Sequence, residues 1–329
     1  MPLHPRLAER LEFEAEQYPD LTSVPTEEAR EAVREMARET DRLAGGPPSV
    51  ALLRETSFRG PDGRVRLRVY LPVGPEQIPG VVAYFHSGGW IFGDLDTQDG
   101  ICREITNRSG AAVVSVDYRR APEHRFPAAL GDAEAAVRWL AEPETAERLG
   151  YDPARLAVAG DDVGGNLALG VGRRLRTGGP PLAALILVCP VLGGSSPTAS
   201  RAEFATGYGL EQSFVDWSWQ QYLPHPDLLR DPDASPAEDP ELAALPPVLL
   251  VSAECDPLRD DAAQLGDRLR AAGVPVTESR YAGMIHGFLD YRGLVEEAGH
   301  ALEEIGTALR SALRPRPTGE GPLGAAAGA

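Results

Sequence analysis

A chain of 329 residues suits one large α/β domain with a cap better than two independent domains. Hydrophobic residues make up 43% of it and charged residues 25%, so a core of good size can form. The formal net charge of -17 argues against nucleic acid and anionic membranes as partners, because the sequence contains no basic stripe to neutralise phosphates.

The three cysteines, Cys102, Cys189 and Cys255, form no CxxC pair and no Cys/His cluster with the spacing of metal ligands. We therefore expect no metal site. A sparse, odd number of cysteines suits a reducing compartment. The N-terminus lacks the apolar segment of a signal peptide, and no window approaches ~18 consecutive apolar residues. The expected location is the cytoplasm.

Residues 1–45 are expected to be helical and polar and to form part of a cap. Thr26 followed by Glu27 and Glu28 has the form of a helix start, and apolar residues then recur on a helical period. The Gly-Pro-Pro run at 46–48 breaks the chain before the main domain begins.

Short apolar runs rich in Val, Leu and Ile are typical of strands buried on both faces of a sheet. Those predicted as strands are residues 51–58, 64–72, 80–86, 111–118, 155–162, 182–191 and 246–254. Helical patterns occur between them, at residues 100–110, 128–142, 166–179 and 262–273. Alternation of this kind predicts a mostly parallel, doubly wound α/β sheet over residues 46–313. The turn GPDG at 60–63 joins the first two runs as a hairpin, which implies an antiparallel edge.

Residues of about 195–240 interrupt the alternation with tryptophans, a tyrosine and several prolines. We interpret them as a cap insertion that packs over the active site with the N-terminal helices. The Gly-, Pro- and Ala-rich tail at 314–329 is predicted to be disordered.

Two adjacent glycines follow the run at 80–86, in the segment His86-Ser87-Gly88-Gly89-Trp90. Such a pair lets the backbone turn so that successive N–H groups face a common point, where they can hold a developing oxyanion. Gly88 and Gly89 are therefore candidate oxyanion donors, and the neighbouring His86 and Ser87 are candidate substrate-binding residues.

Glycines also flank Asp162, in the segment Gly160-Asp161-Asp162-Val163-Gly164-Gly165-Asn166 between a predicted strand and a predicted helix. This is the setting of a nucleophile elbow, whose consensus is G-x-S-x-G. The Val163 N–H would complete the oxyanion site. The central residue is Asp162 instead of serine.

An acid at a strand end and a late histidine complete the pattern. Asp256 follows the run at 246–254, and His286 lies in Gly-Met-Ile-His-Gly-Phe. Elbow, acid and histidine occur here in the chain order of an α/β-hydrolase. The expected catalytic group is Asp162, His286 and Asp256.

These motifs resemble those of the hormone-sensitive-lipase group of α/β-hydrolases, also known as bacterial family IV esterases. The segments that resemble its HGGGW, YRLAPE…FPAA, GDSAGGN, DPLRDE and HGF motifs are HSGGW (86–90), YRRAPEH with FPAA (118–129), GDDVGGN (160–166), DPLRD (256–260) and HGF (286–288). The resemblance extends from about Val50 to Leu309.

The resemblance implies an eight-stranded α/β-hydrolase fold with a helical cap and an esterase or lipase that acts on short acyl chains without a cofactor. It assigns Gly88, Gly89 and Val163 as oxyanion donors, Asp256 as the orienting acid and His286 as the base. The partner is then a small-molecule substrate. A homodimer stays open, because dimers are common in that family.

Two departures from the family pattern bear on the reaction. Ser87 replaces the first glycine of HGGG, and Asp162 replaces the serine. A carboxylate that attacks an ester carbonyl forms a mixed anhydride and is a better leaving group than an alkoxide, so ester hydrolysis through Asp162 should be poor. The carboxylate can instead occupy the oxyanion site. Two neighbouring negative charges should raise the pKa of His286.

Several functions stay open on the sequence. Asp162 acts as a nucleophile toward sp³ carbon, as in epoxide hydrolases, or Asp162 and His286 act as base and acid in a dehydratase or cyclase. A nucleophile at sp³ carbon needs a cap residue that holds the leaving group, and the candidates are Tyr208, Trp217, Trp219 and Tyr222. The remaining alternatives are a carboxylesterase with a substituted serine and a non-catalytic binding protein similar to the gibberellin receptor.

Overall fold

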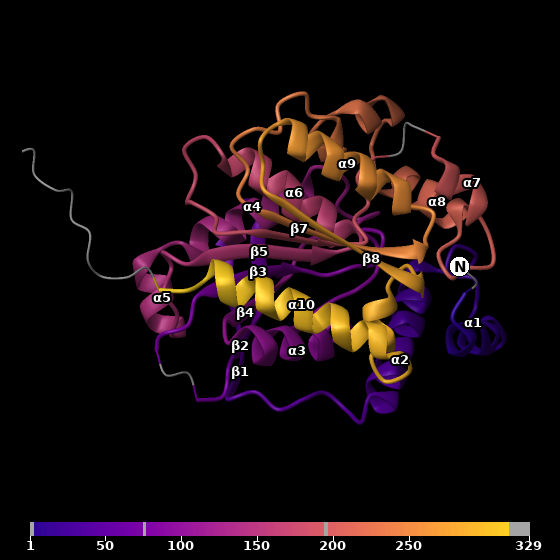
Figure 1. The fold of residues 1–329 in the computed structure, drawn as a ribbon, viewed down its shortest axis with the longest axis horizontal. Coiled ribbons are helices and arrows are strands. Elements are labelled where there is room, and N and C mark those ends of the chain that lie inside the picture. The colour runs from indigo at the N-terminus through magenta and orange to yellow at the C-terminus, as the bar shows by residue number, and fades with distance from the viewer. Residues whose placement is uncertain (1–2, 75–76, 194–196, 316–329) are drawn as a thin grey trace, which may run out of the picture.

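The computed structural model describes residues 3–74, 77–193 and 197–315, which form an eight-stranded sheet with helices on both faces (Figure 1). The strands are β1 (Leu52–Gly60), β2 (Gly63–Leu71), β3 (Val81–Phe85), β4 (Ala112–Asp117), β5 (Leu156–Asp161), β6 (Leu185–Val188), β7 (Val248–Cys255) and β8 (Val276–Ile285). Their order across the sheet is β1-β2-β4-β3-β5-β6-β7-β8. Only β2 runs antiparallel to its neighbours, and the remaining pairs are parallel. The predicted α/β-hydrolase sheet with an antiparallel edge is confirmed.

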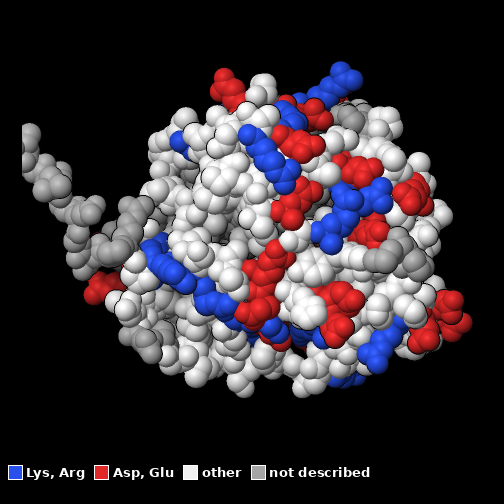
Figure 2. Space-filling model, in the orientation of Figure 1, with Lys and Arg blue, Asp and Glu red and all other residues white. Residues whose placement is uncertain are grey.

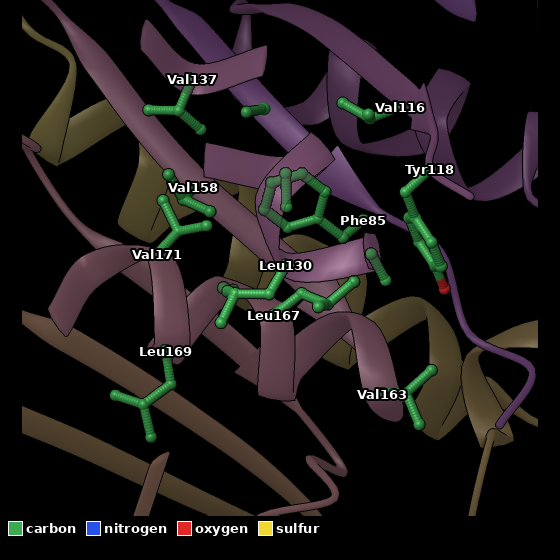
Figure 3. Packing of buried hydrophobic residues seen from close by; sticks show 14 of the residues in the cluster. Phe85, Val116, Tyr118, Leu130, Val137, Val158, Val163, Leu167, Leu169 and Val171 are labelled. Atoms are coloured by element: carbon green, nitrogen blue, oxygen red, sulfur yellow. The ribbon is translucent and has the colours of Figure 1, made fainter. Parts of the chain in front are cut away.

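Two hydrophobic cores cover the two faces of the sheet. On one face pack α4 (Ala128–Leu140), α6 (Val163–Leu175) and α9 (Arg259–Ala271), and on the other pack α3 (Asp99–Ser109) and α10 (Glu296–Ala312). Figure 3 shows the first core, in which Leu167 of α6 and Leu130 of α4 point toward Phe85 of β3. All five residues of β3 are buried, which explains the continuous apolar run.

The end of the sheet where the parallel strands finish carries four further helices: α1 (Pro5–Gln17), α2 (Thr26–Leu43), α7 (Ala199–Glu203) and α8 (Gln212–Tyr222). The helix α2 begins at the predicted Thr26. Arg30 of α2 connects these helices to the sheet domain by hydrogen bonds. Its buried guanidinium donates to the carbonyls of Ile91 and Ala121 and to the carboxylate of Glu123.

Three elements were not predicted from the sequence. The strand β8 lies at the sheet edge and contains four consecutive polar residues at 277–280, so it lacks a continuous apolar run. The helices α5 (Pro143–Leu149) and α10 were also missed, and short 3-10 helices η1 (Pro226–Arg230), η2 (Pro236–Glu238) and η3 (Phe288–Tyr291) complete the structure. Most of the tail that was predicted to be disordered, residues 316–329, lies outside the described residues.

Charges of both signs are interspersed on the described residues seen in Figure 2, where Arg side chains lie beside Asp and Glu side chains. Ion pairs among the described residues include Arg108 with Glu104 and Arg270 with Glu278. Among the described helices, none combines the length and the apolar character that a membrane span requires.

Candidate active site

A sharp turn between β5 and α6 carries Asp162. Its backbone has φ 56° and ψ -120°, a strained conformation for a residue with a side chain and the one expected at a nucleophile elbow. Gly160 and Gly164 permit this turn, since a Cβ at Gly160 would collide with the Gly164 carbonyl and a Cβ at Gly164 with the Phe85 carbonyl. Asp162 therefore projects from the start of α6 at the C-terminal edge of the sheet.

The loop after β3 binds the Asp162 carboxylate directly. The amides of Gly88 and Gly89 donate to its Oδ2 at 2.9 Å and 3.0 Å. Both glycines have positive φ, 113° and 61°, which turns their N–H groups toward one point. Val163 is buried at the first position of α6 and lines the same small cavity as Gly89 and Asp162. One oxygen of Asp162 thus occupies the position that a substrate carbonyl oxygen would need.

His286 lies against the other oxygen of Asp162. Its Nε2 is 3.5 Å from Asp162 Oδ1, and its Nδ1 is 3.0 Å from Asp256 Oδ2. Asp256 is 1% exposed, and its second oxygen accepts from the Leu258 amide at 2.8 Å. The structure brings the three predicted side chains together as a chain of acid, imidazole and carboxylate.

The charges of Asp162, His286 and Asp256 determine which of these groups carry a proton. Burial by itself would lower the pKa of His286, but the negative charge of Asp256 and the contact with Asp162 raise it well above its usual range. Burial would raise the pKa of Asp162, yet His286 and the amides of Gly88 and Gly89 hold it below its usual value. At neutral pH the site therefore contains an imidazolium between two carboxylates.

Of the two predicted neighbours of the oxyanion donors, Ser87 lines a cavity beside the loop, whereas His86 lines neither cavity there. His86 is fully buried behind the loop, where its ring stacks on Tyr118 at 4.2 Å and the Tyr118 hydroxyl donates to its carbonyl. Burial lowers the pKa of His86, so the ring is neutral. The Ser87 hydroxyl accepts from Gln98 Nε2 at 3.2 Å. His86 supports the loop from behind, and the expectation that it contacts substrate is wrong for this conformation.

Two cavities adjoin the oxyanion loop. The larger, about 140 Å³, borders Gly88 and lies under α2. Its lining combines apolar side chains with polar ones, chiefly Leu21, Val33, Met36, Ala37, Ser87, Gln98 and Asp290. The smaller, about 10 Å³, lies under α8 and includes Gly89 and Asp162 in its lining. These cavities could not be predicted from the sequence, because both depend on how the helices pack over the sheet.

Of the four aromatic residues proposed to hold a leaving group, one reaches the smaller cavity. Trp219 lines it. Tyr222 stacks on Trp90 at 4.1 Å, and Trp217 packs near Phe92 with the ring centroids 5.9 Å apart. Tyr208 makes an edge contact with Phe204. Tyr208, Trp217 and Tyr222 therefore serve packing in this conformation.

Cys189 lies close to the His286–Asp256 pair, and one potential ligand atom from each of the three residues falls within 4.8 Å of the others. Burial raises the pKa of the Cys189 thiol well above its usual range, so it stays protonated. The Cys189 thiol therefore adds no negative charge beside the His286–Asp256 pair.

Comparison with known proteins gives a consistent result. A family model described as alpha/beta hydrolase fold matches residues 82–290. The esterase LipI of Mycobacterium tuberculosis is 40% identical over 86% of this chain and 88% of its own, and the ethyl acetate hydrolase of Pseudomonas putida is 35% identical over 87% and 91%. The hyperthermophilic esterase of the archaeon Pyrobaculum calidifontis has a TM-score of 0.88 at 36% identity, covering 94% of this chain and 99% of its own. The chain belongs to the α/β-hydrolase family, in the hormone-sensitive-lipase-like group with these esterases.

Proposed function

We propose that the protein hydrolyses small epoxides through a covalent ester of Asp162. The observation that supports this most directly is that the two oxygens of its carboxylate have different partners. Oδ2 accepts from the Gly88 and Gly89 amides, while Oδ1 receives no backbone donor from the described residues and lies 3.5 Å from His286 Nε2. A carboxylate held by one oxygen presents the other as a nucleophile.

An sp³ carbon is a better target for this group than an ester carbonyl. Attack on a carbonyl would place the new oxyanion where Oδ2 already lies, with the two amide donors already used. Attack on sp³ carbon needs no oxyanion site in its first step. The donors of Gly88 and Gly89 then act in the second step, when water adds to the alkyl–enzyme ester whose carbonyl oxygen is Oδ2.

The steps balance in atoms and protons. Oδ1 forms a bond to a ring carbon, the ring C–O bond breaks, and its electron pair stays on the ring oxygen as an alkoxide. Asp162 is now a neutral ester, so the pKa of His286 falls and the imidazolium releases its proton to the alkoxide. Neutral His286 then takes a proton from water, and the hydroxide attacks the ester carbonyl. Collapse of this adduct releases the diol and restores the ionised Asp162.

The proton on His286 favours an epoxide over an alkyl halide among sp³ electrophiles. The departing ring oxygen must gain a proton to become a hydroxyl, whereas a halide leaves as a stable anion. An imidazolium in the resting site can give this proton to the ring oxygen of an epoxide, whereas a departing halide does not require one.

Covalent trapping tests the proposal. The variant His286→Gln keeps a donor beside Asp162 but lacks the base for hydrolysis, so incubation with styrene oxide should leave a mass increase equal to the epoxide on the peptide with Asp162. The variant Asp162→Asn with the same treatment should carry none. Diol formation by the native protein with no adduct in His286→Gln would contradict the covalent route.

The names of the relatives favour a second candidate, ester hydrolysis. It would require a water molecule activated by Asp162 and His286 instead of an acyl-enzyme, and it predicts cleavage of p-nitrophenyl esters by the native protein.

Acid–base chemistry of a dehydratase or cyclase uses the same ionised Asp162 and protonated His286 and predicts turnover without an adduct. A non-catalytic binding protein would have no use for the Asp256–His286 pair.

A further inference from the structure

Helix α8 brings two buried hydrogen-bond donors to the small cavity beside Asp162. Ser218 is 3% exposed and Trp219 is 6% exposed, and both line this cavity. Within the part of the chain that the structure describes, neither Ser218 Oγ nor Trp219 Nε1 has a hydrogen-bond partner. Buried donors without a partner are rare and costly in a folded protein. The lining of this cavity also includes Trp90, whose Nε1 likewise has no partner among the described residues. Three such donors around one cavity indicate an acceptor that arrives with a ligand.

Ser218 lies next to the oxyanion loop. Its Oγ is 2.7 Å from the position that a Cβ would take on Gly89, whose amide donates to Asp162 Oδ2 at 3.0 Å. Trp219 follows Ser218 on the same helix, and Trp90 packs against it at a ring-centroid distance of 4.6 Å. The two donors therefore come from the cap, on the side of the site opposite the elbow that carries Asp162.

The two cavities differ in size, so they suit different parts of a substrate. The cavity under α8 measures about 10 Å³, which is room for about one water-sized group. The cavity under α2 measures about 140 Å³, close to the volume of about 150 Å³ that is known to admit a benzene ring in an apolar protein cavity. Val33 and Met36 of α2 supply apolar surface for such a group.

We propose that Ser218 Oγ–H and Trp219 Nε1–H hold the oxygen of a monosubstituted epoxide, while its substituent, up to the size of a phenyl ring, lies in the cavity under α2. This inference rests on the proposed function and names its substrate class. As Asp162 Oδ1 bonds to the ring carbon and the C–O bond breaks, the electron pair moves to an oxygen that accepts two hydrogen bonds. The proton that completes the hydroxyl comes from the His286 imidazolium.

The rate of alkylation measures the contribution of these donors without later steps. In the His286→Gln background with styrene oxide, Ser218→Ala and Trp219→Phe should each slow formation of the Asp162 adduct by about 100-fold, as loss of a donor to a developing oxyanion does elsewhere. The matched controls on the same helix are Ser213→Ala, at an exposed serine, and Trp217→Phe, at a tryptophan outside the cavity lining. Both controls should alkylate at the parent rate.

A second reaction separates leaving-group binding from a structural role. In an Asp162→Ser background, hydrolysis of p-nitrophenyl acetate uses the Gly88 and Gly89 donors and does not require an acceptor under α8. Ser218→Ala should lower that activity by much less than the alkylation rate, for which a loss of about 100-fold is expected, because the oxyanion of an ester develops at the Gly88 and Gly89 amides. An equal loss in both reactions would mean that Ser218 only supports the loop, and would overturn the inference.

A binding measurement keeps this inference separate from the proposed function. Acetophenone carries a phenyl group and an unreactive carbonyl acceptor, and calorimetry should show binding to the native protein that weakens at least tenfold in Ser218→Ala. If styrene oxide gives no adduct but this difference holds, the subsite stands and the covalent mechanism fails. If adducts form at the parent rate in Ser218→Ala and Trp219→Phe, or if acetophenone binds both proteins equally, the donors do not hold the substrate oxygen.

Discussion

Replacing Asp162 with serine should convert the site into an esterase. The change removes the carboxylate oxygen that accepts from the Gly88 and Gly89 amides and so frees both donors for a substrate carbonyl. It also removes a negative charge beside His286, which lowers the pKa of the imidazole and lets it act as a base near neutral pH. The elbow already holds residue 162 at the strained φ of 56°, so the substitution to serine requires no change of backbone conformation.

The size of the gain follows from the donors. Loss of a single oxyanion donor costs about 10²- to 10³-fold in kcat, so a site with both donors blocked should be slower by about 10⁴-fold or more. Asp162→Ser should therefore exceed the native protein by at least about 10⁴-fold in kcat/KM for p-nitrophenyl acetate. It should also exceed Asp162→Ala, because alanine frees the donors but supplies no nucleophile. The double variant Asp162→Ser with His286→Ala should lose this gain. Equal activity of Asp162→Ser and Asp162→Ala would show that the loop and the His286–Asp256 pair do not form a working site.

Three further outcomes follow from the structure. Arg30→Ala should lower the free energy of unfolding by about 2–3 kcal/mol in a urea titration, because two buried backbone carbonyls lose their donor, and a change under about 0.5 kcal/mol would show that the α2 contact is dispensable. The folded-state pKa of His286 lies above its unfolded value of about 6.5, so its stabilisation is complete below that pH and is lost as pH rises through the folded pKa. Urea unfolding across this range should show a smaller pH-dependent loss for Asp162→Asn than for the native protein, and identical slopes would contradict the assigned charges. Gly89→Ala should reduce the esterase activity of Asp162→Ser by about 100-fold, because a Cβ there lies 2.7 Å from Ser218 Oγ at a φ of 61°, and retained activity would mean that the loop is not held as described.

Much of the sheet could be predicted because its central strands are buried on both faces. Runs such as Val81–Phe85 and Leu156–Asp161 contain the continuous apolar sequence that such burial requires. The edge strand β8 gave no such signal, since its outer residues include Glu278 and Arg280. The helix α10 carries its buried residues on a regular helical spacing, so attention to periodicity would have found it.

The site divides in a similar way. Asp162, Asp256 and the paired glycines at 88–89 could be placed from local sequence, because each follows an apolar run that predicts a strand. His286 was found from its motif and its place in the chain order, since the strand before it, β8, was not predicted. The position of Ser218 over the oxyanion loop could not be predicted, because it depends on how α8 packs across the end of the sheet. The buried orientation of His86 was missed for the same reason, since its stacking partner Tyr118 belongs to another strand connection.

The central claim is that Asp162 forms a bond to substrate carbon, and a single-turnover reaction in oxygen-18 water tests it most directly. With protein in excess over styrene oxide, the oxygen added to the diol should come from the Asp162 carboxylate and carry no label, while the peptide with Asp162 gains oxygen-18. Labelled diol together with an unlabelled Asp162 would mean that water attacks the epoxide directly, and would contradict the covalent mechanism.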